Sequence, residues 1–387
     1  MDDRRFTSTA FGRIIQAPGG GFPYDAFEPA PLPRSLALAA DVVVALSEAD
    51  RALGRLAGAG RLLPNPHLLI GPYMLREAVS SSRIEGTQAS LSDVLEARSG
   101  GPESPDVAEV LNYVRALQFG LARLNDLPVC VRLLCEVHEH LLRGVRGESR
   151  LPGEVRRSQN WIGEGSVALA DAIFVPPPVE QMRAALDDLE RFLNEAPPLP
   201  PLIRCGLAHY QFETIHPFLD GNGRLGRLLM VFLMTEWGLL PQPLLYLSAY
   251  FETRRAEYYN RLQAVRERGE IDQWLSFFLD GVTTQASDAL LRAERLGDLR
   301  EGYHARLAGG RSRGREVVDL AFESPVVTSA MVVERLSITA AGAVKLLGRL
   351  EGEGILREIE RLPGRSRRWV ASEILETLDR AAPEGSP

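Results

Sequence analysis

Twelve consecutive residues in the middle of the chain carry side chains suited to phosphate chemistry. The segment from His216 to Arg227 reads HPFLDGNGRLGR. Gly221, Asn222 and Gly223 favour backbone angles that turn several N–H groups to one side, which forms an anion-binding nest. An apolar helical pattern begins directly after them, so the nest is expected at a helix N-terminus, where phosphate binds well.

Charged side chains surround this nest. Arg224 and Arg227 are three residues apart and share one helix face, from which both can bind phosphate oxygens. Asp220 stands at the lip of the nest, and a carboxylate beside phosphates is the usual protein ligand of Mg²⁺. His216 is a histidine, and the ordinary pKa of histidine suits proton transfer near neutrality. A calcium loop is a competing interpretation of Asp-Gly-Asn-Gly, but the later acidic ligands are missing.

A second polar segment, Ser81 to Gly86, reads SSRIEG. By itself it predicts the end of a helix, with Gly86 as the C-cap residue and Glu85 as a solvated carboxylate.

Helices must position these residues, because helical periodicity dominates the first 300 residues and almost no alternating pattern occurs before residue 315. The Pro- and Gly-rich residues 1–34 predict an extended arm, and residues 151–178 predict turns and short extended pieces. Ser90 is the expected N-cap of a short helix. The predicted helical segments are 35–60, 72–80, 90–98, 105–146, 179–194, 201–215, 224–237, 254–268 and 271–295.

The C-terminal part has a different pattern. Residues 308–314 (AGGRSRG) predict a linker, and residues 311–378 predict a winged-helix domain with three helices followed by two strands. The net charge of residues 311–372 is +3. DNA binding is one hypothesis for this domain. Contact with a protein or dimer formation is the other, because the helix at 339–352 has few groups able to read bases. The arginines around the predicted wing are Arg357, Arg361, Arg365, Arg367 and Arg368.

The composition is that of a globular protein with more than one domain: 387 residues, 45% hydrophobic and 25% charged. The net charge of −7 argues against a polyanion binder overall. Three cysteines without a CxxC pair predict neither a disulfide framework nor a zinc site. No signal peptide and no apolar run of membrane-spanning length is present, so we expect a cytoplasmic protein without membrane contact.

The segment HPFLDGNGRLGR resembles the Fic-family signature HxFx(D/E)GNGRxxR at every defining position. The resemblance extends to HEHLLRGVRGESRLPGEVRRSQNWIG with FVPPP, and to PLLYLSAYFETRRAEYYNRL, and so spans roughly residues 35–295. It implies a mainly α fold, a Fic-type helical bundle with a small β-hairpin flap. The expected division is an arm at 1–34, a helical region with an inhibitory motif at 35–105 and a catalytic core at 106–300.

The same resemblance implies transfer of AMP from ATP to Ser, Thr or Tyr hydroxyl groups of target proteins (AMPylation). His216 would be the catalytic base, and Phe218 would anchor the loop in the core. Asp220 would bind Mg²⁺ as the cofactor. Arg224 would bind the phosphate chain of ATP, and Arg227 the γ-phosphate.

Further roles follow from the resemblance in the same way. Gly221, Asn222 and Gly223 would hold the phosphates through backbone and side-chain donors. Tyr258 would contribute to the adenine pocket together with Tyr259, for which helix packing is the alternative. The flap at residues 173–176 would hold the target segment by strand addition.

Residues Ser81 to Gly86 resemble the inhibitory motif (S/T)xxxE(G/N), in which Ser81 and Glu85 are the defining residues. Glu85 would pair with Arg227, so that ATP binds in a pose that cannot react. The alternatives left open are removal of AMP, a different nucleotide donor, and a DNA-binding regulator acting through the winged helix. Homodimer formation and the target protein stay open as well.

Overall fold

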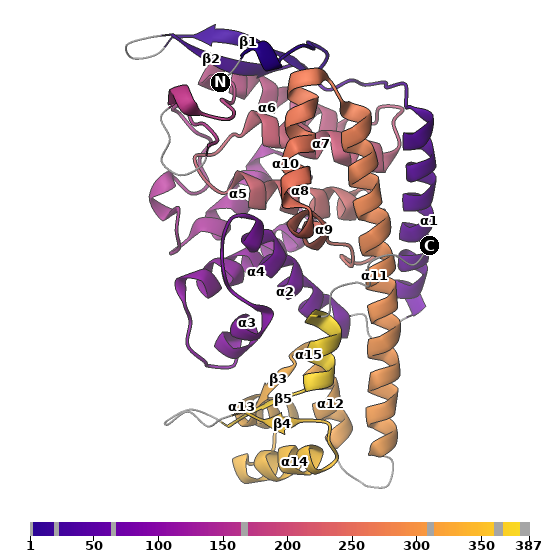
Figure 1. The fold of residues 1–387 in the computed structure, drawn as a ribbon. Helices are drawn as coiled ribbons and strands as arrows, with labels where there is room; N and C mark the ends of the chain where they lie inside the picture. The colour runs from indigo at the N-terminus through magenta and orange to yellow at the C-terminus, as the bar shows by residue number, and fades with distance from the viewer. Residues whose placement is uncertain are drawn as a thin grey trace.

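The computed structural model describes residues 3–18, 23–62, 67–163, 169–307, 313–359 and 367–379. Figure 1 shows a mainly helical body with a β-hairpin at one end and a smaller C-terminal module at the other. The helices of the body are α1 (Ala40–Leu62), α2 (His67–Ile84), α3 (Leu91–Arg98), α4 (Pro105–Arg123), α5 (Val131–Leu142), α6 (Val179–Asn194), α7 (Pro201–Ile215), α8 (Asn222–Glu236), α9 (Ser248–Thr253), α10 (Arg255–Arg268) and α11 (Ile271–Arg306).

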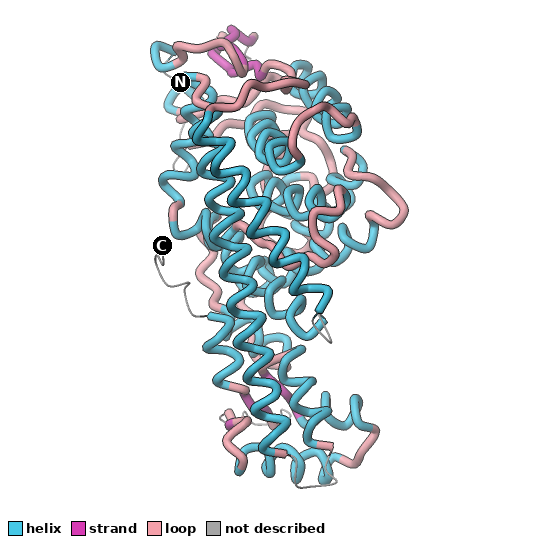
Figure 2. Tube along the Cα trace, turned by 90° about the vertical axis from the view of Figure 1, so that its right-hand side faces the viewer, coloured by secondary structure: helices cyan, strands magenta, loops and turns pink. Residues whose placement is uncertain are grey.

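Helices α7 and α8 form the centre of the body. Every residue of α7 after Pro201 is buried, which agrees with a segment that is apolar on most of its faces. In α8 the buried residues include both Arg224 and Arg227. The outer helices α1 and α11 lie side by side along one flank of the body, as Figures 1 and 2 show.

Many predicted elements are confirmed. Helices at 179–194 and 201–215 have the predicted bounds, and Ser90 caps α3 by accepting a hydrogen bond from the Asp93 N–H. Helix α2 begins before Pro72 and continues to Ile84, although the prediction placed it at 72–80. Pro72 lies inside the helix, in its second turn, where its missing N–H removes one backbone hydrogen bond.

The expected extended arm at 1–34 is wrong in one respect, because it contains a hairpin. Strands β1 (Gly12–Ala17) and β2 (Tyr24–Pro29) pair antiparallel, with Gly12 opposite Pro29. Phe27 is fully buried against Phe174, and its N–H donates to the Val175 carbonyl. The strands escaped prediction because their stability depends on this distant packing and not on an alternating pattern.

The C-terminal module is built from α12 (Gly314–Glu323), β3 (Val326–Thr328), α13 (Ser329–Leu336), α14 (Ala340–Gly352), β4 (Arg357–Glu358), β5 (Arg368–Val370) and α15 (Ser372–Asp379). Its strands form an antiparallel sheet in the order β3-β5-β4. The predicted three helices and two strands are therefore present, with β3 and α15 in addition. A winged-helix domain stays a prediction.

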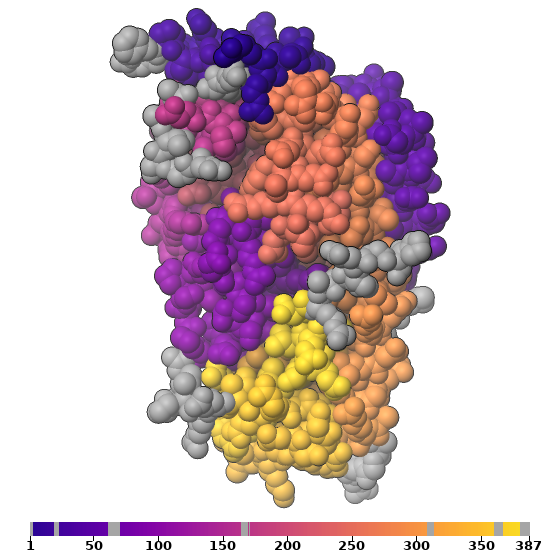
Figure 3. Space-filling view, in the orientation of Figure 1, coloured from indigo at the N-terminus to yellow at the C-terminus, as the bar shows by residue number. Residues whose placement is uncertain are grey.

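The module packs directly on the body (Figure 3). Its buried apolar residues belong to one continuous cluster with those of the body. The side chain of Ser99 donates to the Val326 carbonyl at 3.3 Å, and Arg292 donates to the Leu378 carbonyl at 3.1 Å. Helix α11 extends past its predicted end at residue 295 because its last turns contact α12 and α15.

Two of the five wing arginines are already engaged in this arrangement. Arg367 forms an ion pair with Glu358 at 2.5 Å, and Arg368 is buried with its guanidinium 3.7 Å from Glu96 on α3. Arg368, which was predicted around the wing, is therefore buried against the body. Arg361 and Arg365, the predicted turn between the strands and most of the predicted linker lie outside the described residues.

Within the described residues, no helix combines the length and the apolar character that crossing a membrane requires. Cys130, Cys135 and Cys205 are free thiols.

Candidate functional site at the start of helix α8

The loop from His216 to Gly221 connects α7 to α8 and is held in one conformation. His216 takes the left-handed conformation at φ +49°, where it ends α7, and Gly221 takes φ +76° directly before α8. The Asn222 amide closes the loop, since its Oδ1 accepts from the Phe218 N–H at 2.9 Å and its Nδ2 donates to the Phe218 carbonyl at 2.8 Å. The side chain of Asn222 is thus engaged within the loop, which leaves its backbone N–H for an anion.

Two polar side chains at the base of the flap hold the same loop from outside. The fully buried Arg156 donates to the His216 carbonyl at 3.0 Å and to the Pro177 carbonyl at 2.5 Å. Asn160 donates to the carbonyls of His216 and Phe218 at 3.2 and 2.8 Å. These bonds connect the position of the histidine backbone to the flap.

His138 on α5 supports the loop from below. Its ring stacks on the buried Phe218 with 4.0 Å between the ring centroids. Its Nδ1 accepts from the Gly153 N–H, so its Nε2 carries the proton and donates to the Asp220 carbonyl at 2.9 Å. Burial lowers the pKa of His138 to about 4, so the ring is neutral near pH 7.

The His216 imidazole is half-buried beside the loop. Burial, together with the charges of Arg156 and Arg266, lowers the pKa of His216 to about 3. The ring is therefore neutral at physiological pH, which is the state that a proton acceptor needs. Its Nδ1 is buried without a hydrogen-bond partner among the described residues.

The Asp220 carboxylate lies directly before the nest and is partly exposed. Its Oδ1 accepts from the Gly221 N–H at 2.6 Å, and its side chain is 37% exposed. A Cβ at Gly147 would come within 2.9 Å of Asp220 Oδ2, so this glycine keeps space open beside the carboxylate. Among the described residues, no three His, Cys, Asp or Glu side chains are grouped so that they could hold a metal ion by themselves. One carboxylate with substrate phosphates fits Mg²⁺, which is commonly held in this way.

Both arginines of the motif are buried and each contacts a glutamate. Arg227 donates from Nη2 to Glu85 Oε1 at 2.7 Å, and from Nε to Ser81 Oγ at 2.8 Å. Arg224 lies with Nη1 at 3.3 Å from Glu109 on α4. Although burial acts to raise the pKa of Glu85, the charge of Arg227 lowers it, so Glu85 is ionised.

Glu85 lies directly over the nest. A Cβ at Gly223 would clash with the Glu85 carboxylate, so the absence of a side chain at Gly223 makes room for the glutamate. Gly86 takes φ +97° directly after it, as expected of a C-cap glycine. The structure therefore brings Arg227 to Ser81 and Glu85, which lie 146 and 142 residues before it in the sequence.

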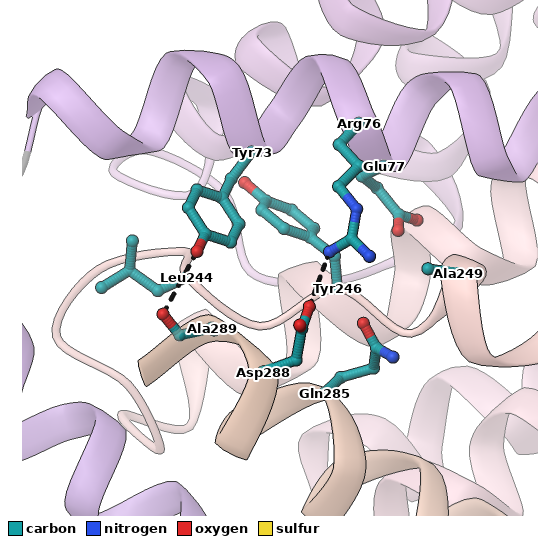
Figure 4. A pocket seen from close by; sticks show the side chains of 9 residues that line it. All are labelled: Tyr73, Arg76, Glu77, Leu244, Tyr246, Ala249, Gln285, Asp288 and Ala289. Atoms are coloured by element: carbon teal, nitrogen blue, oxygen red, sulfur yellow. Dashed lines mark hydrogen bonds and ion pairs between the residues drawn. The ribbon is translucent and has the colours of Figure 1, made fainter. Parts of the chain in front are cut away.

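Helix α2, which carries Ser81 and is followed directly by Glu85, is anchored by a buried polar network. Figure 4 shows Tyr73, Arg76 and Glu77 extending from α2 toward α11 and the segment before α9. Glu77 accepts from Tyr113 at 2.9 Å and from the hydroxyl of Ser248 at 2.5 Å. Burial raises the pKa of Glu77, while its hydrogen bonds act in the opposite direction.

The two tyrosines of α10 differ in environment. Tyr258 is buried, and its hydroxyl lies 2.8 Å from His209 Nε2. Tyr259 is 41% exposed with its ring centroid 5.1 Å from that of Tyr258. The geometry places Tyr258 in the core behind the site, and Tyr259 is the tyrosine that a ligand can reach.

The flap is present as an isolated antiparallel bridge between Ile162 and Phe174. Trp161 and Ile173 beside this bridge are 42% and 50% exposed. Residues 164–168, between the two sides, lie outside the described residues.

Several residues of the site were not identified from the sequence. Glu109, Arg156, Asn160 and Glu213 have no motif of their own, because each acts through a contact with a distant segment. Glu213 is buried behind Arg227, and burial raises its pKa to about 7. A glutamate in the last turn of a mostly apolar helix, which also carries Arg204, His209 and Gln211, was the only available signal for Glu213.

Comparisons with known proteins agree with this geometry. Residues 43–122 match the Fic/DOC family N-terminal domain, and residues 128–234 match the Fic/DOC family. A protein adenylyltransferase Fic of Drosophila grimshawi is 31% identical over 205 residues, which are 51% of this chain and 39% of that protein. Its counterpart in Drosophila melanogaster is 30% identical over 205 residues, 51% of this chain and 38% of that protein. The chain thus spans about two fifths of the length of these relatives.

Solved structures show the same fold. A Fic family protein from Desulfovibrio desulfuricans G20 has a TM-score of 0.57 at 19% identity, covering 91% of this chain and 99% of that one. Fic-1 from C. elegans has a TM-score of 0.52 at 22% identity, covering 67% of this chain and 74% of that one.

Proposed function

The chain belongs to the Fic/DOC family, and from this membership we propose that it transfers AMP from ATP to hydroxyl side chains of target proteins. The observation that carries the proposal is the arrangement at the start of α8: a glycine-rich nest, two buried arginines beneath it and a neutral histidine at its rim. Relatives named protein adenylyltransferase support the same reaction.

In the proposed reaction the nest N–H groups of residues 221–223 and the side chain of Arg224 bind the α- and β-phosphates. Arg227 binds the γ-phosphate. His216 accepts the proton of the target hydroxyl, whose oxygen attacks the α-phosphorus. The bond from the α-phosphorus to the bridging oxygen breaks, and pyrophosphate leaves with the electron pair. Positioning and charge neutralisation supply most of the acceleration in such a transfer.

Asp220 would hold Mg²⁺, which supplies neutralisation of the phosphate charge when it is bound. Tyr259 is the better placed of the two tyrosines for contact with the nucleotide, with Tyr258 supporting it from the core. The exposed Trp161 and Ile173 of the flap would contact the target segment.

The same site contains its own inhibitor in this proposal. Glu85 forms an ion pair with Arg227 at 2.7 Å and lies over Gly223. In this position it takes the place where the γ-phosphate would otherwise bind. The isolated chain is therefore expected to have low activity until Glu85 leaves. Target identity and the signal that releases Glu85 are separate questions.

The experiment is a label-transfer assay on the Glu85→Gly variant with Mg²⁺, reading self-labelling and labelling of added lysate. We expect label from α-labelled ATP, none from γ-labelled ATP, and none when His216→Ala is combined with Glu85→Gly. Transfer from γ-labelled ATP would show a phosphotransferase instead, and transfer from α-labelled UTP alone would show a different donor. Loss of preformed label on incubation without nucleotide would reveal removal of AMP.

A further inference from the structure

The second arginine of the site, Arg224, is held by a glutamate on a different helix from Glu85. Glu109 lies on α4 and its residue is 3% exposed, while Arg224 is 1% exposed. Buried charges are stable only when they are paired, and each of these two side chains supplies a partner for the other. Arg224 Nη1 lies 3.3 Å from Glu109 Oε2, which is 115 residues away in the sequence.

The same oxygen of Glu109 accepts from two other parts of the site. Arg146, in the loop after α5, donates to Oε2 at 3.2 Å. Thr87 donates to Oε2 at 3.5 Å and directly follows Gly86 at the end of the inhibitory motif. Gly147, next to Arg146, borders the Asp220 carboxylate. One carboxylate oxygen therefore connects Arg224 with both the inhibitory segment and the loop beside Asp220.

The contact leaves most of the guanidinium available. Among the described residues, Arg224 Nε is buried without a hydrogen-bond partner, and Nη2 approaches Asp220 only to 3.7 Å. A side chain held at one nitrogen is oriented, while its other donors remain available for a phosphate. An arginine that is already ordered loses less conformational freedom when it binds phosphate.

We propose that Glu109 is a positioning residue that orients Arg224 for the β-phosphate of the nucleotide and links its position to the inhibitory segment through Thr87. The inference rests on the proposed nucleotide-binding function of the nest. It differs from a second inhibitory role, in which Glu109 would compete with phosphate for Arg224.

The test is calorimetric titration of the full chain with ADP and, separately, with adenosine, at fixed Mg²⁺. Glu109→Gln keeps the size of the side chain and removes its charge. We expect it to weaken ADP binding about tenfold, the size of a lost hydrogen bond between charged groups, and to leave adenosine binding unchanged. Glu109→Asp should recover part of the affinity. Glu139→Gln, which removes an exposed partner of Arg143 on α5, is the matched control and should change neither titration.

A double-mutant cycle separates positioning from general support of the fold. In an Arg224→Ala background, Glu109→Gln should cause no further loss of ADP affinity. Equal weakening of ADP and adenosine, or full additivity with Arg224→Ala, would assign Glu109 a structural role only and overturn the inference. Tighter ADP binding by Glu109→Gln would overturn it in favour of competition.

A surface variant covers the case in which Glu109→Gln does not fold. Arg146 is 58% exposed, so Arg146→Gln is tolerated by the fold, and it should weaken ADP binding about twofold to threefold. If this variant leaves the ADP affinity unchanged, the result counts against a role of the Glu109 contacts in nucleotide binding. If the wild-type chain binds neither ADP nor ATP, the proposed function fails. If it binds ADP through Arg224 but Glu109→Gln binds ADP like wild type, only this inference fails.

Discussion

Removing the negative charge of Glu85 should activate the enzyme in graded steps. Glu85 Oε1 accepts from Arg227 at 2.7 Å, while Ser81 accepts from the same guanidinium through its hydroxyl and its carbonyl at 2.8 and 3.0 Å. Glu85→Gly therefore frees Arg227 from a carboxylate without removing the contacts that position it. Residue 85 follows the last residue of α2, so glycine there does not interrupt the helix.

The size of the effect follows from the environment of the pair. The Glu85 side chain is 30% exposed and Arg227 is fully buried, so the interaction is partly screened. A hydrogen bond between charged groups contributes about 1.5 to 3 kcal/mol, which corresponds to roughly tenfold to a hundredfold in rate. Glu85→Gln retains a hydrogen-bond acceptor without the charge, so its rate should increase by only roughly threefold to tenfold over wild type.

The assay is the initial rate of self-labelling from α-labelled ATP for wild type, Glu85→Gln and Glu85→Gly. Glu252→Gln is the matched control, since Glu252 pairs with Arg83 at the same end of α2 without touching Arg227. Equal activation by Glu252→Gln would attribute the effect to loosening of α2. Wild-type rates for both Glu85 variants, with nucleotide binding intact, would refute competition for Arg227 as the mechanism of inhibition.

Three further predictions concern stability. The pKa of Glu213 is raised from its ordinary 4.5 to about 7, so its contribution to stability is present at low pH and is lost as pH rises through 7. In urea unfolding, Glu213→Gln should therefore be more stable than wild type by about 3 kcal/mol at pH 8.5 and should have a similar stability at pH 4.5. Arg156→Ala should lower the free energy of unfolding by about 3 kcal/mol, because the carbonyls of His216 and Pro177 lose their donor. Arg157 is exposed, so Arg157→Ala should change the free energy of unfolding by less than about 0.5 kcal/mol. Gly120→Ala should lower the melting temperature and cost about 1 to 3 kcal/mol of stability, because a Cβ would clash with the Phe232 ring. Gly297→Ala, which has open space around it, should be neutral or stabilising. A Gly120→Ala variant as stable as wild type would contradict the packing of α4 on α8.

Local signals in the sequence were sufficient for much of the fold. The bounds of α6 and α7, the Ser90 cap and the glycine that ends the inhibitory segment each depend on neighbours within a few residues. Helical periodicity and capping are properties of one turn of chain, so a sequence displays them directly. The same holds for the nest, whose glycines and helix start are adjacent in the chain.

Contacts between segments that are far apart in the sequence could not be predicted from these local signals. The β1–β2 hairpin was missed because Phe27 is buried against the flap residue Phe174, and the two segments are remote in sequence. Tyr258 and Tyr259 are neighbours with the same side chain. Only the packing of α10 on α11, with the hydrogen bond from Tyr258 to His209 on α7, directs one inward and the other outward.

The sequence by itself determined which chemical groups this protein has, including the base, the carboxylate and the arginines of the motif, and it determined the bounds of α6 and α7. The tertiary structure alone decided which of those groups meet. Arg227 reaches Ser81 across 146 residues, and Arg224 reaches Glu109 across 115. Such pairs depend on how whole helices pack, and packing is set by the combined burial of many apolar side chains, which no single segment of the sequence encodes.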